Sequence, residues 1–207
     1  MKELTLYSMP SSGNSYKVRL LLSLLDRAYA HVGMEYETQE LAKAHADGVL
    51  PLKKLPVLEL ADGTRIPESN AILCYLAEGT GWMPTDPVER TLVLGWMFWE
   101  QNQHEGVIAV RAAILTYASR AHLRTPERLA ELLDRGHDLL RQMDEHLAAR
   151  SWLVGEAPTV ADISLYAYSH SAGSKGGYAL DRYRNVGDWL ARIEALDGYV
   201  GLDDIPS

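Results

Sequence analysis

Residues 4–22 read Leu-Thr-Leu-Tyr-Ser-Met-Pro-Ser-Ser-Gly-Asn-Ser-Tyr-Lys-Val-Arg-Leu-Leu-Leu, and this stretch decides the fold. A β-prone run is broken by Met9-Pro10, and residues typical of turns and helix caps follow at positions 11–14. From residue 15 onward, apolar side chains recur at helical spacing. We therefore expect a strand over residues 3–7, a turn, and a helix over residues 15–27.

Small hydroxyl and amide side chains stand where that helix begins. The first turn of a helix exposes N–H groups without partners and carries a partial positive charge, so it favours an anion. Ser12 or Asn14 can hold a thiolate, a carboxylate or a phosphate at this place. Either residue can instead simply cap the helix, which is the commoner role of serine and asparagine there.

The composition is that of an ordinary globular chain of one large or two small domains, with 207 residues, 47% of them apolar. No apolar run approaches the roughly 18 residues of a membrane span, and the first residues lack a signal-peptide pattern. The single cysteine, Cys74, excludes an internal disulfide and favours a reducing, cytoplasmic location. The net charge of −8 argues against nucleic-acid binding, which needs a basic face.

The first 80 residues alternate strands and helices. We expect a second strand over residues 31–37, a short helix over 38–46 and a third strand over 55–60. Asp62-Gly63 is a strong hairpin signal that pairs residues 64–67 back as an edge strand. A helix over residues 69–78 completes a β-α-β-α-β-β-α order, which indicates an α/β domain.

Everything after a Gly- and Pro-rich linker is predicted to be helical. Long helices are expected over residues 88–120 and 125–150, and a last one over 186–196. Thr159 and Asp162 have the spacing of N-cap and N3 residues in a capping box. The sequence thus predicts an α/β domain over residues 1–79, a linker over 80–87 and an all-helical domain over 88–207.

Two common kinds of catalytic centre are not indicated. The seven histidines have no i, i+4 pairing with an acid, so no metal site is predicted. The chain has no Gly-x-Ser-x-Gly elbow, which argues against a serine hydrolase.

Three motifs, in order, resemble those of cytosolic glutathione S-transferases of bacterial type, and the resemblance covers both halves of the chain. Residues 7–19 resemble the catalytic loop of the serine-type classes, in which the active serine lies five residues before a basic residue followed by Val. Residues 54–58 and 67–73 resemble the segments that bind glutathione, and Thr159-x-x-Asp162 resembles the family's buried capping box. The resemblance implies a thioredoxin-like domain followed by a helical domain.

The resemblance also implies roles in thiol activation. Ser12 is expected to donate a hydrogen bond to the glutathione sulfur, with Asn14 as a second donor or as the organiser of the loop. Ser11 stays open as an alternative if the loop is shifted by one residue. Tyr7 stays open because the tyrosine-type classes keep their catalytic phenol at the end of the first strand, although packing is the commoner role there.

Further residues are expected to hold the rest of glutathione. Pro56 is expected to be cis, so that the backbone of Leu55 can pair with the tripeptide. Glu68 can accept from the ligand ammonium, and Ser69 at a helix N-terminus can bind a carboxylate. Lys54, and with less support Lys53, can meet the glycine carboxylate. The family's Asn-Pro-x-Gly is replaced by residues 50–53, Leu-Pro-Leu-Lys, which puts the glycyl contact in question.

The electrophile is expected in a pocket lined by Met9, Pro10, Trp99, Gln103 and Val107. The resemblance implies glutathione as co-substrate, a homodimer, a role in detoxification, and conjugation to small electrophiles. Two other functions stay open: a glutathione-dependent disulfide or peroxide reductase, in which Asn14 would matter more, and a non-catalytic interaction module.

Overall fold

The computed structural model describes residues 4–206, which form two compact units. The first contains the chain up to Thr80 together with the closing segment from Leu196, and the second spans Gly81–Ala195. The closing segment differs from the expected division, since the sequence places it in the helical domain. Side chains of the first helix donate hydrogen bonds to the backbone of the closing segment, as described below. Glu3, the first residue of the expected strand, lies outside the described residues.

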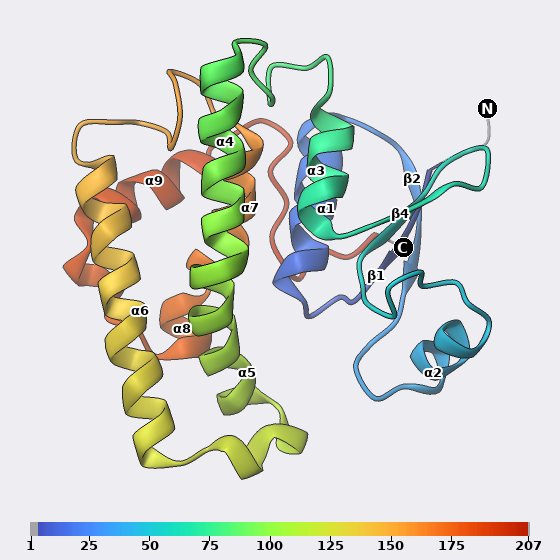
Figure 1. The fold of residues 1–207 in the computed structure, drawn as a ribbon, viewed down its shortest axis with the longest axis horizontal. Helices are drawn as coiled ribbons and strands as arrows, with labels where there is room; N and C mark the ends of the chain where they lie inside the picture. Colours follow the sequence, from blue (N-terminus) through green and yellow to red (C-terminus); the bar gives the residue numbers. More distant parts are fainter. Residues whose placement is uncertain (1–3, 207) are drawn as a thin grey trace. The chain divides into compact units, whose positions relative to one another are not determined.

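The first unit is built on a four-stranded mixed sheet of order β2-β1-β3-β4 (Figure 1). β1 (Leu4–Ser8) pairs in parallel with β2 (Tyr29–Gly33) and antiparallel with β3 (Val57–Glu59), and β4 (Arg65–Pro67) pairs antiparallel with β3. Helices α1 (Gly13–Leu24) and α3 (Ser69–Ala77) pack against each other, and α2 (Gln39–Ala46) contributes Ala44 to a core cluster with Val57. This is the thioredoxin-like arrangement, so the predicted fold of this domain is confirmed.

The register of the sheet explains the largest error in the expected strands. β2 pairs residue by residue with β1, from Leu4–Tyr29 to Ser8–Gly33. Beyond that point β1 gives way to Met9-Pro10, so the segment after Gly33 has no strand to pair with. The prediction of a strand over residues 31–37 was therefore wrong in its second half. The hairpin at Asp62-Gly63 is confirmed by the pairing of β3 with β4.

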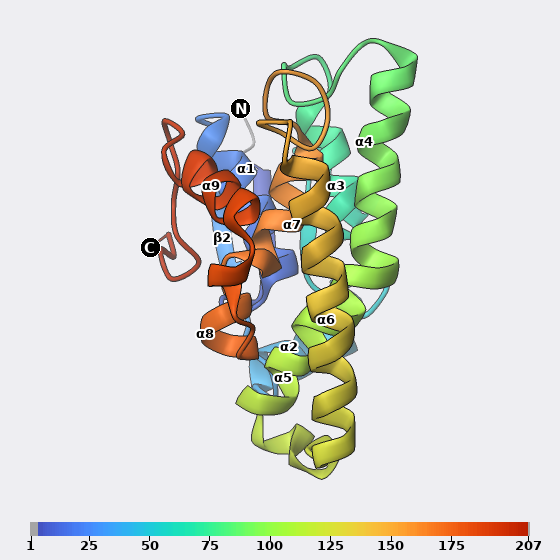
Figure 2. The ribbon, with the colours of Figure 1, turned by 90° about the vertical axis from the view of Figure 1, so that its left-hand side faces the viewer.

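The second unit is helical, as predicted (Figure 2). Helix α4 (Pro87–Trp99) runs through a π-helical segment, η1 (Glu100–Ala109), into α5 (Val110–Thr116), where one α-helix over residues 88–120 was expected. The remaining elements are η2 (Ala118–Leu123), α6 (Pro126–Leu147), α7 (Val160–Ser169), α8 (Ala172–Gly176), η3 (Leu180–Arg182) and α9 (Arg184–Glu194). Among the described residues, none of the helices combines the length and apolarity needed to span a membrane.

The predicted capping box is present at the start of α7. Asp162 is fully buried, and its carboxylate accepts hydrogen bonds from the Thr159 N–H at 2.8 Å and the Thr159 hydroxyl at 3.1 Å. It also accepts from the Leu153 N–H at 3.0 Å and from Trp189 Nε1 at 2.9 Å. Burial raises the pKa of Asp162, and these four hydrogen bonds oppose that shift. One carboxylate thus joins the start of α7 to the preceding loop and to α9.

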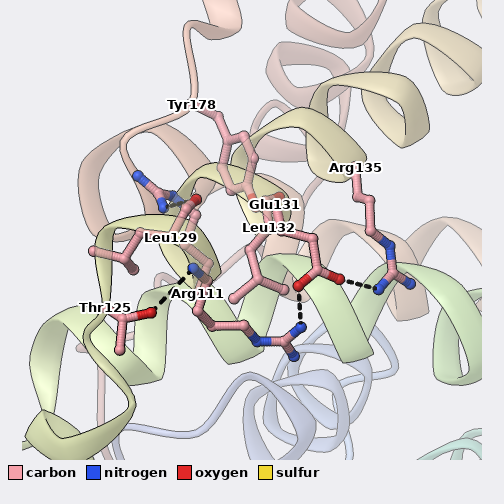
Figure 3. A network of polar contacts seen from close by, with 8 residues as sticks. Arg111, Thr125, Leu129, Glu131, Leu132, Arg135 and Tyr178 are labelled. Atoms are coloured by element: carbon pink, nitrogen blue, oxygen red, sulfur yellow. Dashed lines mark hydrogen bonds and ion pairs between the residues drawn. The ribbon is translucent and has the colours of Figure 1, made fainter.

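Tyr178 is enclosed where α5, α6 and α8 meet (Figure 3). It is 3% exposed, its hydroxyl donates to the Leu132 carbonyl at 3.0 Å, and burial raises its pKa to about 12. Arg111 lies 5.9 Å from the ring centroid and donates to the Gly176 carbonyl at 2.7 Å. A Cβ atom added to Gly136 would lie 2.2 Å from a ring carbon of Tyr178, so this glycine is required by close packing.

We expect Gly136→Ala to destabilise the protein by about 1–3 kcal/mol, because a rigid, buried ring cannot move aside. Urea unfolding measures the change. Gly187→Ala on α9 is the matched control, since its Cβ would meet no atom within 4 Å. That variant should be neutral or slightly more stable, because alanine favours a helix. Equal stability of the two variants would contradict the packing argument.

Candidate active site

Ser12 stands at the N-cap of α1 with an extended backbone, φ −86° and ψ 129°. Its N–H donates to the Met9 carbonyl at 3.1 Å, which closes the turn after β1. Its side chain makes no capping hydrogen bond. Of the two roles that the sequence left open for Ser12, simple capping is therefore not the one adopted. Ser12 is partly exposed at the start of the helix, beside its first N–H groups.

Ser11 and Tyr7, the two alternative donors to the thiol, donate hydrogen bonds to carboxylates of the chain instead. The Ser11 hydroxyl donates to one carboxylate oxygen of Glu35 at 2.7 Å, and its N–H donates to the other at 3.2 Å. The Tyr7 hydroxyl donates to Glu59 at 3.4 Å, and its ring packs on the core cluster that includes Met34. These contacts favour Ser12 over either alternative, although the choice stays a prediction.

The catalytic-loop motif and the second glutathione motif meet in the structure. Ser69, the first residue of α3 and 5% exposed, donates from its hydroxyl to Asn14 Oδ1 at 3.2 Å. The starts of α1 and α3 therefore lie together. Lys17, which is fully buried, reaches Asn70 Oδ1 at 3.5 Å in the same region. Two helix N-termini and a buried ammonium group make this a place that favours an anion.

Glu68 precedes α3 with φ +68° and ψ 114°. A side chain other than glycine in this left-handed region is strained by about 1–3 kcal/mol, and such strain gathers at binding sites. The Glu68 side chain is exposed, while Ser69 beside it is buried. The pair can thus present a carboxylate to solvent and a hydroxyl with a backbone N–H to a ligand.

The segment before β3 has the geometry that the resemblance implies. The Leu55–Pro56 peptide bond is cis. Within residues 4–206, the backbone N–H and C=O of Leu55 have no hydrogen-bond partner in the chain. Lys53 and Lys54 are exposed, and Lys53 has φ +55°. A peptide can therefore pair at Leu55 with two lysines beside it.

Supporting contacts around the loop were missed by sequence reasoning. Ser15 Oγ accepts from the Met9 N–H at 2.9 Å, and Glu35 holds Ser11 as described. Arg19 is buried beneath the loop and donates to the Pro10 carbonyl at 3.0 Å. Glu35 lies in a segment that was expected to be a strand, and it belongs to none of the motifs in the sequence, so no signal indicated its role. The Arg19 position lies inside the catalytic-loop motif, but no pattern indicated its burial.

The predicted pocket residues fall in both units. Met9 and Pro10 are partly buried in the loop after β1. In the helical unit, Val107 is fully buried in a core cluster with Ile114, Leu132 and Leu139, and Trp99 packs against that cluster. Gln103 is exposed on η1. Packing thus accounts for Val107, and the pocket as a whole stays a prediction. Within the described part of the chain, no group of three His, Cys, Asp or Glu residues could hold a metal ion.

His31 adds a titratable group next to the loop. Its Nε2 lies 2.7 Å from Ser8 Oγ on β1, and its ring stacks edge-on to Tyr29. Burial, and then the charge of Arg19, lower the pKa of His31, and a hydrogen bond to the backbone of Pro206 opposes this. The folded protein therefore accepts this proton less readily than the unfolded chain does.

We accordingly expect stability to fall as the pH drops below about 6.5, the ordinary histidine pKa, because the unfolded state then binds more protons. Urea unfolding at several pH values between about 7.5 and 5.5 measures the slope. The slope should be smaller in His31→Gln than in the native protein. Identical slopes in the native protein and His31→Gln would contradict the assignment.

Two sequence profiles of known protein domains match this chain, one in each of its two units. Residues 6–81 match the sequence profile "Glutathione S-transferase, N-terminal domain", and residues 108–197 match "Glutathione S-transferase, C-terminal domain". The chain is 32% identical over 179 residues to a maleylacetoacetate isomerase of Rhizobium meliloti, covering 82% of each chain. It is 27% identical over 206 residues to the disulfide-bond oxidoreductase YfcG of Escherichia coli, covering 92% of this chain and 89% of YfcG.

Solved structures of glutathione S-transferases also resemble this chain over nearly its whole length. A glutathione S-transferase of Pseudomonas fluorescens superposes with a TM-score of 0.90 at 39% identity, covering 97% of this chain and 99% of that one. A second family member from the same species, solved with two glutathione molecules bound, has a TM-score of 0.85 at 24% identity, covering 99% and 94%; it shows likeness of fold alone. On these matches over both units, the chain belongs to the glutathione S-transferase family.

Proposed function

We propose that this protein is a serine-type glutathione transferase that activates the glutathione thiol for attack on a small electrophile. The observation that carries the proposal is the position of Ser12, whose hydroxyl stands at the N-terminus of α1 and does not cap the helix. Its neighbours Asn14 and Ser69 join that helix to the start of α3. Asn14 organises the loop through this bond and is the second candidate donor to the sulfur.

Simple magnitudes support a serine as the activating group. A free thiol with a pKa near 8.5 is about 3% thiolate at pH 7. Lowering that pKa by about two units requires about 2.7 kcal/mol of stabilisation of the thiolate. A hydrogen bond to a charged acceptor contributes roughly 1.5–3 kcal/mol, and a helix N-terminus adds up to about 1–2 kcal/mol. One hydroxyl with the start of α1 is therefore sufficient, and no histidine base is needed.

The remainder of glutathione fits the other residues of the first unit. The tripeptide backbone pairs with Leu55, its γ-glutamyl carboxylate meets Ser69 and the start of α3, and its ammonium meets Glu68. Lys54 meets the glycine carboxylate. Membership of the glutathione S-transferase family supports this ligand. Glutathione is reduced in the cytoplasm, where we place the protein.

A second candidate reaction uses the same thiolate. The relative from Rhizobium meliloti, 32% identical, is a maleylacetoacetate isomerase. A thiolate that adds to a conjugated cis double bond leaves a single bond that rotates. Elimination of the thiolate then restores the double bond in the trans form. Disulfide reduction is the third candidate, because YfcG is 27% identical over most of both chains.

We also propose a homodimer, which the family resemblance implies. Helix α4 leaves three large apolar side chains exposed: Val88 is 65% exposed, Leu92 54% and Phe98 65%. Large apolar side chains exposed together on one helix are typical of an interface. Light scattering should give about twice 23.1 kDa for the native protein and a smaller mass for Phe98→Glu. A native monomer would contradict the dimer.

The function is tested by measuring glutathione binding by calorimetry and then turnover with three substrate types. These are a chlorinated dinitrobenzene, a cis-enedione acid and a small dialkyl disulfide. Turnover of the first with a saturable dependence on glutathione supports the transferase, and preference for the second or third selects that reaction instead. Binding without turnover in all three assays would favour the interaction module. Absence of glutathione binding would overturn the proposal.

A further inference from the structure

The closing segment of the chain is held along α1 by three side chains of that helix. The Tyr16 hydroxyl donates to the Val200 carbonyl at 2.7 Å, and the Ser23 hydroxyl donates to the Gly198 carbonyl at 2.7 Å. Arg19 Nη2 donates to the Leu202 carbonyl at 2.8 Å. Leu202 itself is buried. Residues 198–202 therefore belong structurally to the first unit.

Arg19 differs from the other two residues because it also holds the catalytic loop. Its Nη2 donates to the Pro10 carbonyl at 3.0 Å, and Nη1 donates to the Met9 carbonyl at 3.5 Å. The side chain is 1% exposed. Its acceptors are thus three backbone carbonyls, two from the loop and one from the closing segment. A buried guanidinium group joins these two parts of the unit.

The same carbonyl connects Arg19 to Ser12. The Met9 oxygen accepts from the Ser12 N–H as well as from Arg19. The guanidinium group of Arg19 therefore contacts the same turn that positions the Ser12 backbone. Arg19 Nε has no hydrogen-bond partner among the described residues, and the carboxylates of Asp203 and Glu35 act on the guanidinium group only through their charge. A buried positive charge beneath the loop favours a thiolate above it.

We propose that Arg19 is a positioning residue of the thiol site, and that the Leu202 carbonyl of the closing segment keeps its guanidinium group in place. The inference rests on the proposed function for the thiol itself, and it extends the site to the closing segment of the chain. Arg19 does not touch the sulfur. It sets the position of Ser12 through the Met9 and Pro10 carbonyls, and a displacement of about 1 Å at a catalytic group can cost about 100-fold in rate.

The first test needs no glutathione. Hydrogen–deuterium exchange of the peptide covering residues 9–16 is measured in the native protein, Arg19→Met and the conservative Arg19→Lys. Ser23→Ala is the matched control, because it removes a bond from α1 to the closing segment and leaves the loop contacts intact. We expect exchange at least about tenfold faster in Arg19→Met, a smaller increase in Arg19→Lys, and no change in Ser23→Ala. Exchange within about twofold of native in both Arg19 variants would overturn the proposal.

The second test reads the thiol in folded variants, monitored by circular dichroism. Ultraviolet difference absorbance should place the thiolate midpoint of bound glutathione about one pH unit higher in Arg19→Lys than in Ser23→Ala. Faster loop exchange with an unchanged midpoint would show a purely structural role and overturn the inference. Native protein that does not bind glutathione would overturn the proposed function, while the exchange result would still decide whether Arg19 holds the loop.

Discussion

Replacing Ser12 with alanine is expected to lower the turnover number about 10- to 100-fold, while the dissociation constant of glutathione changes less than about threefold. The change removes one hydrogen bond to a charged sulfur, and such a bond contributes roughly 1.5–3 kcal/mol. The contacts proposed for the rest of glutathione, at Leu55, Glu68 and Ser69, remain. Steady-state kinetics at saturating glutathione and calorimetry measure the two quantities separately.

Ser11→Ala is the matched control for this experiment. Ser11 is the adjacent serine, and its hydroxyl donates to Glu35. Its loss should change turnover less than about threefold, since the Ser11 N–H still holds the same carboxylate. The reverse result, a large loss in Ser11→Ala and none in Ser12→Ala, would show that the loop acts shifted by one residue.

Asp162→Ala is expected to destabilise the protein by about 3–5 kcal/mol, which is large for a single substitution. The change leaves four buried donors on Leu153, Thr159 and Trp189 without their acceptor. Each unsatisfied buried group costs roughly 1–3 kcal/mol, and relaxation of the loop recovers part of the sum. Urea unfolding followed by tryptophan fluorescence measures the loss.

Two further variants make this result specific. Asp162→Asn keeps one acceptor oxygen and should lose less stability than Asp162→Ala. Asp134→Ala, an exposed aspartate on α6, should stay within about 0.5 kcal/mol of the native protein. A loss in Asp162→Ala no larger than that in Asp134→Ala would contradict the role assigned to the capping box.

Local patterns were sufficient for much of the fold. The Asp62-Gly63 hairpin, the helix beginning after Thr38 and the Thr159–Asp162 capping box depend on residues a few positions apart, so each was predicted correctly. The end of β2 depends on where β1 ends, which is a contact between distant residues. The π-helical segment was missed because a search for helical periodicity assumes 3.6 residues per turn. Glu100 and His104 of that segment bond Ser164 and Ser169 of α7.

In the candidate site, too, the contacts between residues far apart in the sequence could not be predicted. Asn14 and Ser69 could be proposed from motifs, but their direct bond is known only from the folded chain. The burial of Lys17 and Arg19 was not predicted, because charged residues on a helix are usually exposed. The anchoring of Arg19 by Leu202 joins residues 183 positions apart, and no local pattern reports such a contact.

Ultraviolet difference absorbance of bound glutathione across pH tests the central proposal most directly, in the native protein and in Ser12→Ala. We predict that the native complex contains thiolate with a midpoint about two units below that of the free thiol, and that Ser12→Ala returns the midpoint close to the free value. The same lowered midpoint in both proteins would show that Ser12 does not activate the thiol.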